Sequence, residues 1–103
     1  MSIPIGNYNF EGPFISTGLL EDRAGVYAIL DKRINGKYYV LDIGESAEVR
    51  TRVENHDRSS CWALNQQGDI VYAAYYTPHI PQSGRIKIEQ ELRTQYNPPC
   101  GER

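Results

Sequence analysis

Several features that many small proteins rely on are scarce in this chain of 103 residues. It has two cysteines, one methionine and one tryptophan, and its formal net charge is −2. No apolar run approaches the roughly 18 residues that a membrane-spanning helix needs, so we expect no membrane span. The slightly acidic balance argues against a protein that coats nucleic acid through bulk positive charge. It still allows a protein whose positive charge is confined to one cleft.

The N-terminus and the two cysteines together predict a cytoplasmic protein. Residues 1–10 have neither a basic start nor an apolar segment, so we expect no secretory signal. Cys61 and Cys100 lie far apart, and without an export signal they are expected to be free thiols in a reducing compartment. A zinc site that combines the cysteines with His56 and His79 is disfavoured, because the spacing matches no common zinc motif.

Tyrosine is abundant, with eight residues in the chain. It suits half-buried strands and surfaces where the hydroxyl stays in water. Hydrophobic residues make up 40% and charged residues 23%, which is ordinary for a globular protein and leaves room for one modest core. Residues 1–20 are interrupted by glycine and proline, so we expect an irregular N-terminal segment packed on the core. Residues 21–103 are expected to form the domain itself.

A tight β-hairpin is predicted near the start of this domain. Asn35-Gly36 is a strong hairpin signal, because both residues tolerate positive φ. It lies between two β-rich runs, Ala24 to Ile34 and Lys37 to Ile43. A two-residue type I′ turn fixes the register, which makes Tyr27 and Asp42 diagonal neighbours on one face of the sheet.

Two helices and a third strand are expected after the hairpin. Ser46 can cap a helix from Ala47 to about Asp57. The run Asp69 to Tyr76 is predicted to be a buried strand. Ser83 can cap a last helix from about Gly84 to Tyr96. The order β-β-α-β-α predicts an α+β fold, with a three-stranded antiparallel-cored sheet flanked by helices.

Four polar side chains occur in an order that suits phosphodiester hydrolysis. Arg52 and His56 are four residues apart, so they are expected on one stripe of the first helix. Arg52 could clamp a phosphate oxygen, and Tyr27 or His56 could position or deprotonate a water. Glu89 in the last helix could bind one Mg²⁺ or Mn²⁺ ion, because Mg²⁺ is commonly held by one or two carboxylates.

The same residues carry a resemblance to the GIY-YIG nuclease family that covers most of the chain. Gly25-Val26-Tyr27 resembles the family's first motif, and Asp42-Ile43-Gly44 resembles the second. Arg52 follows the second motif at the family's usual distance. His56 stands where a tyrosine or histidine usually follows one turn later. Glu89, with a leucine three residues on, resembles the family's metal-binding glutamate.

The resemblance implies a small α+β domain that hydrolyses nucleic acid, with DNA the expected substrate, using one Mg²⁺ or Mn²⁺ ion. It implies catalytic roles for Tyr27, Arg52 and His56 and a metal-ligand role for Glu89. The chain offers no appended recognition domain, so we expect a homodimer or a partner protein to supply specificity.

Two positions depart from the family pattern. Asp42 stands where the family usually has tyrosine, so one phenol is missing. The Asp42 carboxylate could act as a catalytic base, serve as a second metal ligand, or mark a lineage that has lost activity. Asn97 is only an approximate match to the family's late asparagine. The main alternative is therefore a catalytically inactive domain of this kind that binds nucleic acid or a protein partner.

Four further residues are candidates for contacting the substrate: Arg50, Arg58, Trp62 and Asn97. Arg58 or Trp62 could stack on a base. Trp62 could equally anchor a loop that follows the first helix.

Ordinary structural roles are open for the catalytic candidates as well. Tyr27 could be a strand aromatic, and Arg52 could pair with Glu48 across one helical turn. Glu89 has an arginine four residues before it and another four after it, so a solvated ion-pair ladder would explain it without a metal. An unpaired carboxylate within a sheet is costly, which favours a functional partner for Asp42.

Overall fold

The computed structural model describes residues 1–101 and shows an α+β fold built on one five-stranded antiparallel sheet. The strands are β1 (Ser2–Ile5), β2 (Tyr8–Phe14), β3 (Gly25–Lys32), β4 (Tyr38–Ser46) and β5 (Asp69–Tyr76). Their order across the sheet is β1-β2-β5-β3-β4. β3 is therefore an interior strand, and β4 lies at an edge.

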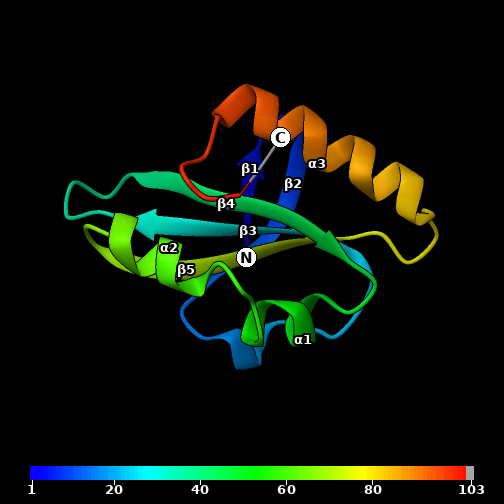
Figure 1. Ribbon diagram of the computed structural model, residues 1–103, viewed down its shortest axis with the longest axis horizontal. Coiled ribbons are helices and arrows are strands. Elements are labelled where there is room, and N and C mark those ends of the chain that lie inside the picture. The colour runs from blue at the N-terminus through cyan, green and yellow to red at the C-terminus, as the bar shows by residue number, and fades with distance from the viewer. Residues whose placement is uncertain (102–103) are drawn as a thin grey trace.

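Helices cover both faces of the sheet (Figure 1). They are α1 (Val49–Glu54), α2 (Ser59–Asn65) and α3 (Gln82–Tyr96), with a 3-10 turn η1 (Thr17–Leu19) before β3. α3 lies over one face, and α1 and α2 lie on the other. Within residues 1–101, no helix is both long and apolar enough to span a membrane.

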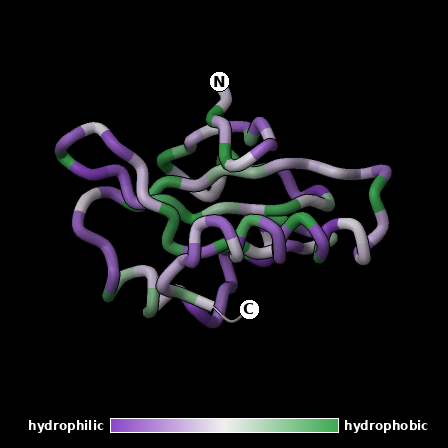
Figure 2. The backbone as a smooth tube through the Cα atoms, turned by 90° about the horizontal axis from the view of Figure 1, so that it is seen from above, coloured by the Kyte–Doolittle hydropathy of each residue, from purple (hydrophilic) through white to green (hydrophobic). Residues whose placement is uncertain are grey.

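The central strand β3 supplies apolar side chains to both faces. Val26, Ala28 and Leu30 belong to the core under α3. Tyr27 and Ile29 point the other way, into the core under α1 and α2. This alternation follows from the two-residue period of a strand, and it makes seven of the eight β3 residues buried. Figure 2 shows the resulting contrast between apolar strand interiors and hydrophilic loops.

The α+β class agrees with the sequence, but the expected three-stranded sheet is wrong in strand number and order. Residues 1–20, expected to be irregular, form β1, β2 and η1, and β2 pairs with β5. Gly12 has φ of 113° and lies at a register shift between Glu11 and Phe14. The glycine that suggested a loop therefore marks a bulge inside a strand.

The first helix is shorter than the sequence predicts. The expected helix from Ala47 to Asp57 is reduced to α1, so His56 lies in the turn after the helix and not on a stripe shared with Arg52. The Ser46 hydroxyl accepts a hydrogen bond from the Glu48 amide at 2.9 Å, but Ser46 stands two residues before Glu48, which is the N-cap position of α1. The segment around Trp62, expected as loop, is the helix α2.

The β3–β4 turn is not the expected two-residue type. The Arg33 amide donates to the Lys37 carbonyl at 3.0 Å, and the Gly36 amide donates to the Arg33 carbonyl at 2.9 Å. Ile34 to Gly36 therefore forms a three-residue loop, in which Gly36 adopts φ of 81°. Glycine supplies this left-handed conformation without steric cost.

A bulge in β4 compensates for the longer turn. Leu30 faces Val40, whereas the next pair is Ile29 with Asp42, so Leu41 is the extra residue. Beyond the bulge, the register is the one expected from a two-residue turn. Tyr27 consequently lies opposite Gly44, as the sequence predicts.

Candidate active site

The glycines of the two motifs make room for one tyrosine. A Cβ atom at Gly44 would overlap the hydroxyl and ring of Tyr27, which lies across β4 at this point. A Cβ atom at Gly25 would lie 2.6 Å from the carbonyl oxygen of Tyr75 in β5. Close packing therefore explains both glycines, and the space left by Gly44 sets the position of the Tyr27 hydroxyl.

Tyr27 and His56 meet in the interior on the α1 and α2 side of the sheet. Tyr27 Oη lies 2.5 Å from His56 Nε2, and the two rings meet edge to face. The Arg58 amide donates to His56 Nδ1 at 3.1 Å. The indole of Trp62 lies beside the imidazole, with ring centroids 4.8 Å apart. Both nitrogens of His56 are thus engaged.

These contacts determine the tautomer of His56. Burial, helped by the positive charges of Arg52 and Arg58, lowers the pKa of His56 to about 4, so the ring is neutral near pH 7. Because Nδ1 accepts the Arg58 amide, the single ring proton lies on Nε2 and is donated to Tyr27 Oη. The Tyr27 O–H can then donate only to a group other than His56.

Charged groups from four parts of the chain act on the Tyr27 hydroxyl. Burial raises the pKa of Tyr27 to about 12, and the Asp42 carboxylate adds to the increase. Arg52 and Arg58 oppose the increase, and Glu89 adds to it. The phenol is therefore protonated at neutral pH. Side chains from α1, from the start of α2 and from α3 all lie close enough to influence it.

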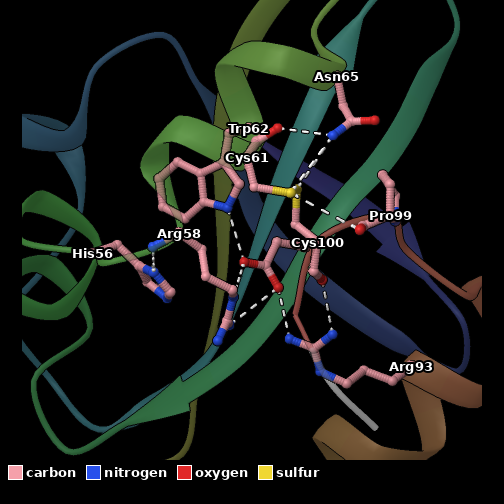
Figure 3. Close-up of a disulfide and its surroundings, with 9 residues drawn as sticks. His56, Arg58, Cys61, Trp62, Asn65, Arg93, Pro99 and Cys100 are labelled. Atoms are coloured by element: carbon pink, nitrogen blue, oxygen red, sulfur yellow. Dashed lines mark hydrogen bonds and ion pairs between the residues drawn. A yellow bond between two sulfur atoms is a disulfide. The ribbon is translucent and has the colours of Figure 1, made fainter.

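Asp42 is the centre of a buried cluster, which we call the Asp42 cluster, formed with Arg58, Trp62 and Arg93. The carboxylate accepts from Arg58 Nε at 2.8 Å and Nη2 at 3.2 Å. It also accepts from Trp62 Nε1 at 2.8 Å and Arg93 Nη2 at 2.6 Å. Figure 3 shows the three donor side chains converging from different elements. These bonds occupy the acceptor positions of the carboxylate, which leaves none of them for a catalytic water or a metal.

Arg93 is the functional neighbour that the sequence argument missed. It is 2% exposed, and besides Asp42 it donates to the carbonyl oxygens of Ile43 and Cys100. Its Nε atom has no hydrogen-bond partner among residues 1–101. The sequence contains the relevant signal, since Arg93 lies four residues after Glu89 and next to Leu92. A helix face that packs on the sheet buries its ion pairs, so this ladder is not a solvated one.

Glu89 lies on the same side of α3 and is only partly enclosed. Its side chain is 17% exposed, and Oε2 lies 3.8 Å from Arg93 Nε, beyond hydrogen-bonding distance. Burial raises the pKa of Glu89, Arg93 lowers it, and Glu45 raises it. Such a carboxylate fits a divalent ion that takes its other ligands from water and phosphate. Within residues 1–101, no three or more His, Cys, Asp or Glu side chains gather in one place.

The α1 arginines lie at the surface. Arg52 Nη2 lies 3.0 Å from the exposed carboxylate of Asp57, and Arg50 pairs with Glu54 at 3.5 Å. The alternative side-chain pairing of Arg52 with Glu48 is not what the structure shows. Exposed ion pairs contribute about 0–1 kcal/mol, so Arg52 can exchange Asp57 for a phosphate oxygen at little cost.

Two candidate substrate contacts are not placed to touch a substrate at the Tyr27 hydroxyl. Trp62 is 4% exposed and faces His56 and Asp42, which leaves no ring face for a base to stack on. Asn97 ends α3 in a left-handed conformation with φ of 48°. It lines a separate surface depression together with Tyr39.

The expectation of two free thiols is wrong, because Cys61 and Cys100 form a disulfide. The bond joins α2 to the segment after α3 (Figure 3), and it excludes a zinc site that uses both thiolates. The Cys100 amide also donates to the Leu41 carbonyl at 3.0 Å. This segment therefore covers part of the β4 edge, which would otherwise present unpaired backbone groups.

No family model, curated protein or solved structure matches this chain.

Proposed function

We propose that the chain is a metal-dependent endonuclease that hydrolyses DNA phosphodiester bonds. One observation carries this proposal: the Tyr27 hydroxyl lies 2.5 Å from His56 and feels the charges of Arg52, Arg58 and Glu89. A protonated phenol, a guanidinium and a carboxylate in one neighbourhood can serve water positioning, phosphate binding and cation binding. The motif resemblance supports the same reaction class.

The roles follow from the state of each side chain. Tyr27, oriented by the Nε2–H of His56, holds the attacking water or a phosphate oxygen. Arg52, which is only weakly held by Asp57, binds and neutralises the phosphate. Asp42 positions Arg58 and Arg93 and takes no direct part in the chemistry, because its oxygens are occupied.

Glu89 is the proposed ligand of one Mg²⁺ or Mn²⁺ ion. When bound, such an ion supplies charge neutralisation at the phosphate and lowers the pKa of its own water. Neutralising Glu89 also removes one of the charges that raise the pKa of Tyr27. The pKa of Tyr27 is then lower, so its deprotonated form, the phenolate, is easier to reach and can act as a base.

Cleavage of supercoiled plasmid DNA tests the proposal. Purified protein should nick or linearise the plasmid with Mn²⁺ or Mg²⁺ and leave it intact in EDTA. Glu89→Gln keeps the shape of the side chain and removes the charge, so we expect the rate to fall about 100-fold or more. Tyr27→Phe removes only the hydroxyl, and we expect a loss of about 10²–10³-fold.

Glu91→Gln is the matched control, because Glu91 lies on the same helix but bonds to Tyr8 at the surface. It should cleave at the wild-type rate. A Glu89→Gln protein that is as active as wild type would remove Glu89 from the chemistry and the single-ion mechanism with it.

A second candidate function is a catalytically inactive domain that binds nucleic acid or a protein. The Asp42 cluster favours it, since the motif position that carries a tyrosine hydroxyl in the GIY-YIG pattern is here a buried ion-pair centre. Retained DNA binding without cleavage, under any divalent-ion condition, would select this alternative. Cleavage that appears only when a second protein is added would show that a partner supplies specificity. Cleavage that appears only at concentrations where the chain dimerises would show that the homodimer supplies it.

The sequence predicts a cytoplasmic location, and this prediction needs a test of its own. Disulfides are uncommon in cytosolic proteins, so the bond between Cys61 and Cys100 weighs against it. Labelling of free thiols before and after cell lysis measures whether the pair is reduced in its own compartment. Reduced thiols in the cell would support a cytoplasmic protein.

A further inference from the structure

The tip of the β3–β4 hairpin combines positive charge with exposed aromatic rings. Lys32, Arg33 and Lys37 lie in a stretch from 32 to 41 that has no acidic residue, although the chain as a whole has net charge −2. Tyr38 and Tyr39 follow at once and are 36% and 37% exposed. Figure 1 shows this loop projecting beyond the end of the sheet. A polyanion complements such a surface.

Arg33 is held in a fixed orientation at this tip. Its Nε donates to the buried carboxylate of Asp31 at 3.0 Å. Its guanidinium carbon lies 3.8 Å from the centroid of the Tyr39 ring. Asp31 is itself held by the amides of Gln67 and Gly68 at 3.0 and 2.8 Å. A guanidinium fixed at Nε and stacked on a ring can offer its terminal nitrogens to a phosphate with little further ordering.

Two surface depressions adjoin at the stack of Arg33 on Tyr39. One has a volume of about 780 Å³, and its wall includes Lys32 and Asp69, which face each other across β3 and β5. The other has a volume of about 380 Å³ and extends along β4 to Asn97. Arg33, Tyr39 and Gln67 line both. Together they form a track that runs from the hairpin tip along the edge strand.

The hairpin tip and the candidate active site lie at two places along the same strand, β4. Tyr39 and Gly44 are five residues apart on β4, and at about 3.4 Å per residue the separation is roughly 17 Å. Gly44 lies against the Tyr27 phenol. Successive phosphates of one DNA strand are spaced by about 3.4 Å along the helix axis, so the same length corresponds to roughly five nucleotides.

We propose that the hairpin-tip surface, formed by Lys32, Arg33 and Tyr39 and flanked by Lys37 in a neighbouring depression, binds the phosphate backbone of DNA. It engages the strand about five nucleotides from the bond placed at Tyr27. The position of that bond rests on the proposed nuclease function, whereas the binding itself does not. This local charge supplies the DNA affinity that the acidic chain lacks in bulk.

Fluorescence anisotropy in EDTA measures this binding without cleavage. The probes are a short fluorescein-labelled DNA duplex and its single strand, titrated over a range of KCl concentrations. We expect Lys32→Ala/Lys37→Ala to raise Kd about tenfold for the preferred probe and to reduce the slope of log K against log salt by roughly two. Both lysines are exposed, so the variant should fold normally, as checked by circular dichroism.

Lys87→Ala is the control, because it removes one lysine charge from an exposed position on α3, away from the hairpin tip. Its Kd should stay within about twofold of wild type. The inference is overturned if the double variant binds like wild type, if Lys87→Ala weakens binding equally, or if the wild-type protein binds neither probe. Weakened binding by the double variant alone supports it, even when wild-type protein cleaves nothing and the nuclease proposal fails.

Discussion

At the scale of single residues, much of the site depends on Asp42. Its buried carboxylate accepts from two arginines and an indole that belong to different elements. Arg93 is almost fully buried, and the next carboxylate, Glu89, is 3.8 Å from its Nε. Asp42 is therefore the close partner that makes a buried guanidinium tolerable. Breaking such a pair leaves a charge in the interior, which costs more than the pair itself contributes.

We expect Asp42→Asn to lower the free energy of unfolding by about 3–5 kcal/mol, because it leaves the Arg93 charge uncompensated. Urea denaturation followed by circular dichroism measures the change. Asp69→Asn, at an exposed strand position, should change stability by less than about 0.5 kcal/mol. Equal stability of Asp42→Asn and wild type would contradict the structural role given to the cluster.

His56 makes stability depend on pH. Burial, with Arg52 and Arg58, lowers its pKa from 6.5 to about 4 in the folded protein. Between these values the unfolded chain binds the extra proton and the folded protein does not, so stability falls as pH falls through this window. We expect a loss of about 2 kcal/mol between pH 7.5 and pH 5.

The measurement is urea denaturation at several pH values, for wild type and for His56→Gln. Glutamine can donate to Tyr27 but does not titrate. The free energy of unfolding of His56→Gln should therefore change less with pH over this window. The same loss in both proteins would assign the pH dependence to other groups.

At the scale of the elements, the β4 edge determines how the site is closed. β4 pairs only with β3 within the sheet, and its outer side meets Arg93 from α3 and the segment that ends at Cys100. The disulfide then ties that segment to α2. Two helices and an edge strand are thus joined around the Asp42 cluster, which keeps the edge from pairing with another chain.

Reduction of the disulfide should lower stability without unfolding the chain outright. The bond spans 39 residues, and closing a loop of this size contributes about 3–4 kcal/mol in the chain-entropy model. We expect Cys61→Ser/Cys100→Ser to lose this amount in urea denaturation. Wild-type protein in dithiothreitol should match the double variant. A double variant as stable as the oxidised protein would show that the bond does not constrain the unfolded chain.

At the scale of the whole molecule, β3 joins two cores. The core under α3 and the core under α1 and α2 share this strand, whose side chains alternate between them. The candidate active site lies on the second side, but α3 reaches it around the β4 edge through Arg93 and Glu89. The two cores should therefore unfold together.

Val71→Ala tests this cooperativity. Val71 belongs to the core under α3, whereas Trp62 reports on the opposite core. We expect a loss of about 2 kcal/mol, with the same midpoint shift by Trp62 fluorescence and by circular dichroism and no change in m-value. Separate transitions by the two probes would show that the cores unfold independently.

The sequence alone determined the elements that have strong local signals. Alternating apolar residues and a glycine turn predicted β3, β4 and β5, and the last helix was placed within two residues of its start. β1 and β2 were missed because Gly6, in the turn between them, and Gly12, at a bulge in β2, look like loop residues. The Tyr27–Gly44 register was correct through two compensating differences, a longer turn and the bulge at Leu41.

Tertiary structure decided what these residues can do. The order of Tyr27 and His56 along the chain suggested that they act together, and the structure shows their side chains in contact. The tautomer of His56, the occupied oxygens of Asp42 and the bond between Cys61 and Cys100 depend on groups far apart in sequence. Periodicity and turn chemistry report only on neighbours along the chain. Which distant polar groups become buried together depends on strand order and on the packing of helices over the sheet.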